Sequence, residues 1–199
     1  MIFIQLLTGI GVFVTLYSAF VLYALRRKPR ADDVRTVITR DGWQIKLYRY
    51  SARGEAASGE PILVVHGANA NQWNMTAPAG ESLVELLAKN GFDCWCIELR
   101  GCRSSAAPKG KSRFQAKIDD YVRHDIPDAI AYILEATGHR RIHCIGHSMG
   151  GMMLYAHAIV NGAPRVASII TIGSPPGFDS VPGLRAFAPV VRAARYFPR

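Results

Sequence analysis

The stretch Gly146-His147-Ser148-Met149-Gly150-Gly151 decides the fold of this 199-residue chain. It follows the run Ile142-His143-Cys144-Ile145, which predicts a β-strand, and it precedes the run Met152-Met153-Leu154-Tyr155-Ala156, which predicts a helix. A serine on a tight turn from strand to helix holds its hydroxyl exposed, and such a turn needs small residues on both sides. An ordinary serine in such a turn would not need glycine at both flanking positions. We therefore predict that Ser148 is a catalytic nucleophile, with Gly146 and Gly150 as supporting residues.

A nucleophile of this kind needs hydrogen-bond donors aimed at the oxyanion that forms during acyl transfer. The amide of Met149, the residue after the nucleophile, is the first predicted donor, and the amino end of the following helix favours the same negative charge. The second is expected from the loop His66-Gly67-Ala68-Asn69, which follows the apolar run of residues 62–65. Gly67 allows a close turn there. We predict that the Ala68 amide, or alternatively that of Asn69, points at the oxyanion and that His66 is structural.

Segments with the period of a strand alternate with helical segments along most of the chain. Strands are predicted over residues 34–40, 43–50, 62–65, 92–99, 141–145 and 166–172, and helices over residues 81–90, 119–137 and 150–160. Asp41-Gly42 predicts a tight hairpin between the first two strands, and Gly91 and Gly138 stand where the first two helices end. Pro127 is acceptable in a first helical turn. The alternation predicts one α/β domain over residues 34–178, with a mostly parallel sheet, helices on both faces, and the site at the carboxyl ends of the strands.

The first 25 residues have a different composition. Residues 2–25 contain no charged side chain, and 24 residues of helix are about 36 Å long, which is enough to cross a bilayer core of about 30 Å. A cleaved signal peptide would need basic residues before the apolar run, and none precedes it here. The run is also longer than most buried helices. The cluster Arg26-Arg27-Lys28-Pro29-Arg30 follows directly. We predict an uncleaved, single-pass membrane anchor, a basic linker over residues 26–33, and a cytoplasmic domain.

The net charge of the chain is +9, and four of its basic residues belong to the cluster after the apolar run, so +5 remains for the rest. No nucleic-acid-binding module is recognisable, and we attribute the charge to a membrane surface and expect no nucleic-acid partner. The four cysteines are Cys94, Cys96, Cys102 and Cys144, and they lack the paired spacing of a zinc site. They are expected to be free thiols.

These motifs resemble the α/β-hydrolase superfamily and, within it, the acid and gastric lipases. The similar segments are Leu63-Val64-Val65-His66-Gly67, Gly91-Phe92-Asp93-Cys94-Trp95, Leu99-Arg100-Gly101, Asp125-Ile126-Pro127-Asp128-Ala129, Thr137-Gly138 and the glycine-flanked Ser148 stretch. They occur in the expected order between about residues 35 and 178. The resemblance implies a serine hydrolase that cleaves esters through an acyl-enzyme and uses no metal or organic cofactor.

One feature of the superfamily is not found. Its triad order is serine, then an acid, then histidine, and no histidine follows His157 here. His157 is nine residues after Ser148 on one helix and is therefore expected on the opposite face. Asp179 is the only acid after Ser148. We expect a chain that stops after the sixth strand, with residues 179–199 at the start of the cap region, an uncovered sheet edge and low stability.

The leading hypothesis is a membrane-anchored esterase or lipase in which Ser148 attacks the carbonyl of a small-molecule or lipid ester. Two alternatives remain at this point. One is an acyltransferase of the same fold, and the other is a catalytically silent membrane protein that keeps the fold for binding, which the missing base favours. The substrate and the oligomeric state are not predicted.

Overall fold

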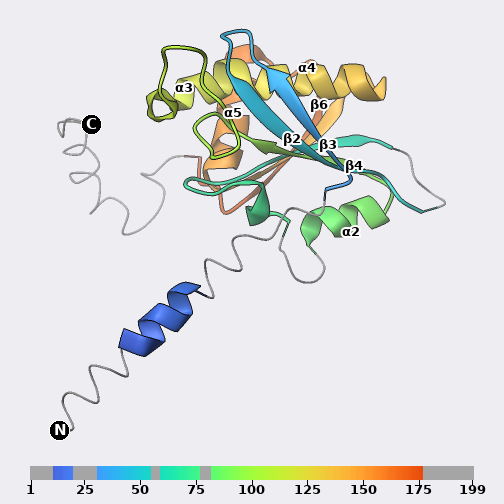
Figure 1. The fold of residues 1–199 in the computed structure, drawn as a ribbon. Coiled ribbons are helices and arrows are strands. Elements are labelled where there is room, and N and C mark those ends of the chain that lie inside the picture. Colours follow the sequence, from blue (N-terminus) through green and yellow to red (C-terminus); the bar gives the residue numbers. More distant parts are fainter. Residues whose placement is uncertain (1–10, 20–30, 55–58, 77–81, 177–199) are drawn as a thin grey trace, which may run out of the picture.

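A computed structural model describes residues 11–19, 31–54, 59–76 and 82–176 of the chain. Residues 11–19 are helical. The strands are β1 (Asp33–Ile38), β2 (Gln44–Tyr50), β3 (Pro61–Val65), β4 (Asp93–Glu98), β5 (Ile142–His147) and β6 (Val166–Ile172). The helices are η1 (Gln72–Asn74), α2 (Leu83–Lys89), η2 (Arg113–Gln115), α3 (Ile118–Asp120), the π-helical turn η3 (Tyr121–Asp125), α4 (Ile126–Thr137) and α5 (Met149–Asn161). The strands form a six-stranded sheet in the order β1-β2-β4-β3-β5-β6 (Figure 1).

The sheet is antiparallel at one edge and parallel elsewhere. β1 and β2 form the predicted hairpin, in which Ile38 pairs with Gln44 and Gly42 takes a positive φ of 86°. β2 then pairs antiparallel with β4, whereas β3, β4, β5 and β6 run parallel. The carboxyl ends of β3, β4 and β5 therefore meet at one edge, where the loop after β3 and the turn after β5 lie close together.

Helices cover both faces of the central strands, as the alternation of elements predicted, whereas β6 is largely exposed in the described structure. Side chains alternate along a strand, so Ile62 and Val64 of β3 pack in the cluster that includes Val84 of α2, while Leu63 and Val65 pack with α4 and α5. Figure 1 shows α2 on one side of the sheet and α4 and α5 on the other. Cys94, Cys96 and Cys144 are buried free thiols and Cys102 is half-buried and free.

The helix predicted over residues 119–137 is confirmed as an unbroken helical stretch, but its first part departs from regular α-helical geometry. The chain forms α3 and the wider π turn η3 before α4 begins at Ile126. Pro127 has no amide hydrogen for the carbonyl of Arg123, four residues earlier, and that carbonyl instead accepts from Arg40 Nη2 at 3.0 Å. Gly138 ends α4 in the left-handed conformation, as predicted.

A buried arginine joins three separate parts of the chain. Arg100, 1% exposed, donates from its amide and Nε to the two carboxylate oxygens of Asp125, each at 2.8 Å. Its Nη1 and Nη2 donate to Asp41 in the β1–β2 hairpin at 2.6 and 2.8 Å, and its guanidinium lies 5.1 Å from the ring centre of Trp43. Because Arg100 follows β4 and Asp125 precedes α4, these bonds fix the hairpin, the end of β4 and the start of α4 together.

The start of α5 lies against the end of β3. A Cβ added to Gly150 would overlap the carbonyl oxygen of Val65 and come within 2.7 Å of that of His66. A Cβ on Gly146 would come within 2.5 Å of the Cα of Gly151. Glycine at positions 146 and 150 therefore lets the first turn of α5 pack directly against β5 and the end of β3. The sequence analysis expected small residues at these positions for this reason.

The predictions about the membrane anchor, the basic linker and the cap region concern residues near the two ends of the chain. Most of the predicted anchor, the linker residues 26–30 and the cap residues 179–199 lie outside the described residues. None of the helices in the described part is both long and apolar enough to cross a membrane. Among the described strands β6 pairs with β5 alone, and its Ile170 is 53% exposed. The absence of further strands stays a prediction.

We expect Asp41→Asn to reduce stability and its dependence on acid. Partial burial raises the pKa of Asp41, but hydrogen bonds from Arg100 and Thr39 outweigh burial and hold this pKa well below its ordinary value. The contribution of Asp41 is therefore complete above about pH 4 and is lost as the pH falls below that. Urea unfolding followed by tryptophan fluorescence should show a loss of about 1–2 kcal/mol at pH 7 that shrinks toward pH 3. Asp33→Asn, in an exposed pair with Arg35, is the control and should cost under about 0.5 kcal/mol. Equal losses for both variants would contradict the interpretation.

Gly150→Ala should destabilise the domain by about 3 kcal/mol or prevent folding, because the new methyl group meets backbone carbonyls that cannot move independently of β3. The urea midpoint and the yield of folded protein measure this. Gly11→Ala is the matched control, since a Cβ there meets nothing within 4 Å. An unchanged midpoint for Gly150→Ala would show that the contact is not constraining.

Candidate active site

Ser148 stands at the turn between β5 and α5 in a conformation that serine rarely adopts. Its φ is 51° and its ψ is −119°, and among the described residues only Asn69 shares a positive φ without being glycine. The amide of Ser148 donates to the carbonyl of Ile172 at 2.8 Å, which holds the turn against the end of β6. The side chain is half-buried, and its hydroxyl has no hydrogen-bond partner among the described residues. The strained backbone thus presents an unpartnered hydroxyl.

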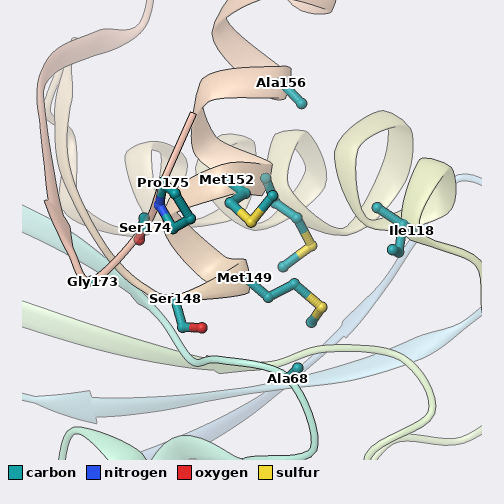
Figure 2. Close-up of a pocket in the computed structure, with 10 residues that line it drawn as sticks. Ala68, Ile118, Ser148, Met149, Met152, Ala156, Gly173, Ser174 and Pro175 are labelled. Carbon is teal, nitrogen blue, oxygen red and sulfur yellow. The ribbon is translucent and has the colours of Figure 1, made fainter. Parts of the chain in front are cut away.

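The Ser148 hydroxyl borders a hollow of about 920 Å³, named here the acyl hollow. One face of α5 supplies much of its wall with the side chains of Met149, Met152, Met153 and Ala156. Ile118 of α3 and Ala68 of the loop after β3 complete the apolar part, and Gly173, Ser174 and Pro175 line it after β6. Figure 2 shows Ser148 at the start of α5, with the Met149 and Met152 side chains beside the space and Ala68 on the neighbouring loop.

Two backbone amides beside Ser148 are without acceptors. Met149 is the first residue of α5, where an amide has no partner within the helix, and neither its amide nor that of Ala68 donates to any described residue. By contrast, the amide of Gly67 donates to Asn74 Oδ1 at 3.3 Å. A Cβ on Gly67 would lie 3.3 Å from that of Ser148, so the Ala68 loop passes directly by the serine.

Hydrogen bonds within the loop and contacts of the buried His66 hold the Ala68 loop in its shape. The carbonyl of Gly67 accepts from the amide of Ala70 at 3.4 Å, and Asn69 takes a φ of 53°, which asparagine tolerates better than most residues. His66, 3% exposed, has Nδ1 at 2.8 Å from the Gly67 carbonyl and accepts at Nε2 from the Leu99 amide at 3.5 Å. Burial lowers the pKa of His66, against the opposing effect of the Gly67 carbonyl. A neutral His66 that donates from Nδ1 and accepts at Nε2 fits both contacts.

None of the six histidines of the chain lines the acyl hollow. His157 is buried on another side of α5, where its Nδ1 lies 3.0 Å from Asn161 Nδ2, and it lines a separate cavity with Pro164 and Arg165. Burial lowers the pKa of His157. His147 precedes Ser148, but its Nδ1 is buried without a partner and a Cβ on Gly67 would lie 3.0 Å from it.

The structure adds residues to the site that the sequence analysis did not name. Met152, Met153 and Ala156 follow Met149 by three, four and seven positions, which is the spacing of one helical face and was readable in the sequence. Ile118 carried no such signal, because α3 is a short turn far along the chain from Ser148. Ser148, Ala68 and Met149, which the sequence did name, lie together in one wall.

Comparison with known proteins agrees with this architecture. The chain matches the family described as "alpha/beta hydrolase fold" over residues 60–195. Human lipase member K is 31% identical over 147 residues, covering 68% of this chain and 36% of that protein. Bovine gastric triacylglycerol lipase is 30% identical over 130 residues, covering 60% of this chain and 32% of that protein. The chain therefore spans about a third of the length of these relatives.

Solved structures share the fold. An esterase structure from Burkholderia cenocepacia, described as a putative aryl esterase, matches with a TM-score of 0.54 at 20% identity, over 73% of this chain and 48% of that chain. An epoxide hydrolase from Vigna radiata matches with a TM-score of 0.55 at 16% identity, over 75% of this chain and 41% of that chain. The resemblance to lipases inferred from the motifs is confirmed, and this chain belongs to the α/β-hydrolase fold family.

Proposed function

We propose that the protein is a membrane-anchored serine hydrolase that cleaves carboxylic esters through an acyl-enzyme on Ser148. The observation that carries this proposal is the pair of acceptor-free amides, Met149 and Ala68, beside the unpartnered hydroxyl of a strained serine. Free amide donors at this position suit the oxyanion that forms during acyl transfer. Several relatives are named triacylglycerol lipases, and an apolar hollow at the serine suits the acyl chain of a lipid ester.

The proposed reaction has two acyl-transfer steps. Ser148 Oγ attacks the ester carbonyl, whose oxygen becomes an oxyanion that accepts from the Met149 and Ala68 amides. Collapse of this intermediate breaks the ester bond, releases the alcohol with the proton taken from Ser148, and leaves the acyl group on Oγ with its chain in the acyl hollow. Water then attacks the acyl-enzyme and releases the acid. Attack by an alcohol in place of water would give the acyltransferase alternative.

Proton transfer in these steps needs a general base. His66 and His157 are held by their own hydrogen bonds away from the hydroxyl, and no other histidine lines the acyl hollow. In the described part of the chain the base is therefore none of these histidines. The second candidate is a silent protein that binds an acyl compound without turnover.

Labelling by a fluorophosphonate probe should separate the two candidates. We expect covalent labelling of the full-length protein at Ser148, detected by intact-mass and peptide mass spectrometry, and its loss in Ser148→Ala. Ser174→Ala is the matched control, because Ser174 lines the same hollow but donates to the Ile172 carbonyl at 3.2 Å. That variant should keep at least half of the labelling. A folded protein that is not labelled, or labelling that survives Ser148→Ala, would favour the silent candidate.

Membrane anchoring is proposed from residues 2–25 and the basic residues that follow them. We expect the full-length protein to stay in the membrane fraction after carbonate extraction and a chain without residues 2–25 to leave it. In spheroplasts the domain should resist external protease until the membrane is opened, since the basic flank stays in the cytoplasm. Digestion of the domain in intact spheroplasts would reverse the orientation, and extraction by carbonate would remove the anchor.

A further inference from the structure

A second hollow lies on the other side of the Ala68 loop. It has a volume of about 400 Å³ and is lined by Gly67, Asn69, Met149, Arg103 and Arg113, among others. Met149 also lines the acyl hollow, and Ala68, between Gly67 and Asn69, lines that hollow too. The Met149 and Ala68 positions therefore separate two spaces of different chemistry, one apolar and one with arginines. We call the second space the basic hollow.

The arginines of the basic hollow belong to an unusually basic loop. Residues 103–117 contain no acid and the five cations Arg103, Lys109, Lys111, Arg113 and Lys117. In the described part of the chain none of these five side chains forms a salt bridge. The Arg113 guanidinium lies 4.8 Å from the centre of the Phe114 ring. Two of the five cations, Arg103 and Arg113, line the basic hollow, and guanidinium groups without a counter-ion raise the electrostatic potential there.

Two of the acids near this loop face the Arg100 guanidinium. An adjoining cavity of about 420 Å³ is lined by Lys111, Lys117, Asp41 and Asp120, among others. Asp41 accepts two hydrogen bonds from Arg100, and Asp120 lies 3.7 Å from Arg100 Nη1. Arg100 also pairs with Asp125, so its single charge offsets these carboxylates only in part, and Lys111 and Lys117 share their cavity with acids. No acid is among the described residues that line the basic hollow itself.

We propose that the basic hollow binds an anionic group on the leaving side of the substrate, so that the substrate is an amphiphilic ester with an apolar acyl chain and a phosphate or carboxylate on its alcohol part. This inference rests on the proposed function, because it places the scissile carbonyl between the two hollows. The acyl chain lies along Met149, Met152 and Ala156, and the anionic group faces Arg103 and Arg113. Arginine side chains bind phosphate and carboxylate oxygens through charge-assisted hydrogen bonds.

The same loop could in principle attract an anionic membrane, but its position disfavours that partner. β1 begins at Asp33, which pairs with Arg49 in β2, and Arg49 pairs in turn with Trp95 near the start of β4. The chain after the proposed anchor therefore enters the sheet at the end opposite to the carboxyl end of β4, from which the basic loop departs (Figure 1). A ligand that reaches the basic hollow comes from the side of the domain away from the anchor's point of entry.

Binding can be measured without turnover in the full chain carrying Ser148→Ala. Isothermal titration calorimetry compares 1-hexanoylglycerol 3-phosphate with 1-hexanoylglycerol, two monomeric ligands that differ only in the phosphate. We expect the phosphate ligand to bind about tenfold or more tightly at low salt, and this preference to fall several-fold at about 0.5 M salt. Arg103→Glu with Arg113→Glu should remove the preference and leave the affinity for the neutral ligand within about twofold.

A charge-matched control separates a site from an overall charge effect. Arg140→Glu with Arg165→Glu changes the net charge by the same amount at two exposed arginines that precede β5 and β6, at the opposite end of the sheet from Ser148. This control should keep the preference. Equal binding of the two ligands by the parent, or an equal loss in both double variants, would overturn the proposal. The proposal would also be overturned if Arg103→Glu with Arg113→Glu lost binding to anionic vesicles but kept the preference for the phosphate ligand. The loop would then bind a membrane rather than the substrate.

The outcome is independent of the hydrolase assignment. Labelling of Ser148 by a fluorophosphonate together with equal binding of the two ligands would leave an ester hydrolase without an anion site. A clear phosphate preference in a protein that resists labelling would leave the anion site and remove the hydrolase.

Discussion

The close approach of α5 to the end of β3 is the constraint on which the site depends. Gly150 lies where any side chain would meet the Val65 and His66 carbonyls, so the first turn of α5 rests directly on the loop that follows β3. This contact brings the Met149 amide and the Ala68 amide to the same side of Ser148, although 80 residues separate the two loops. It also imposes the positive φ of Ser148, because the chain must turn sharply from β5 into a helix that begins one residue later. The contact between α5 and the end of β3 therefore accounts for both the strained backbone of Ser148 and the position of the amides beside it.

A second constraint keeps the rim of the site in place. Arg100 is almost fully buried, and a buried charge is stable only when hydrogen bonds compensate its lost hydration. Asp41 and Asp125 provide those bonds from the hairpin and from the start of α4. Because Arg100 directly precedes the loop of residues 101–117, the bonds fix one end of that loop near the Ala68 segment. The basic side chains further along the loop form no ion pairs in the described structure, and two of them, Arg103 and Arg113, line the basic hollow.

The two hollows give the site a direction. An ester has an acyl chain on one side of its carbonyl and an alcohol group on the other. The walls around Ser148 are likewise of two kinds, one apolar and one basic. Thioether and methyl groups of α5 line one side, and guanidinium groups lie on the other. Two of the relatives are named triacylglycerol lipases. The arginines of this chain give a reason to look beyond neutral esters for its own substrate.

The sequence by itself determined the six strands and the main helices, and it predicted the serine of the candidate site. Glycines around Ser148, the Asp41-Gly42 hairpin and the Gly138 helix end were readable because local backbone geometry restricts which residues are tolerated. The spacing of apolar residues predicted the strands and the helices that pack on the two faces of the sheet. The tertiary structure alone decided three other features. Arg40 donates to the Arg123 carbonyl, which Pro127 leaves free in the π turn before α4. Arg100 joins side chains 25 and 59 residues away, and Ile118 of α3 lines the acyl hollow. Local rules cannot predict such contacts, because they arise only when distant segments meet in space.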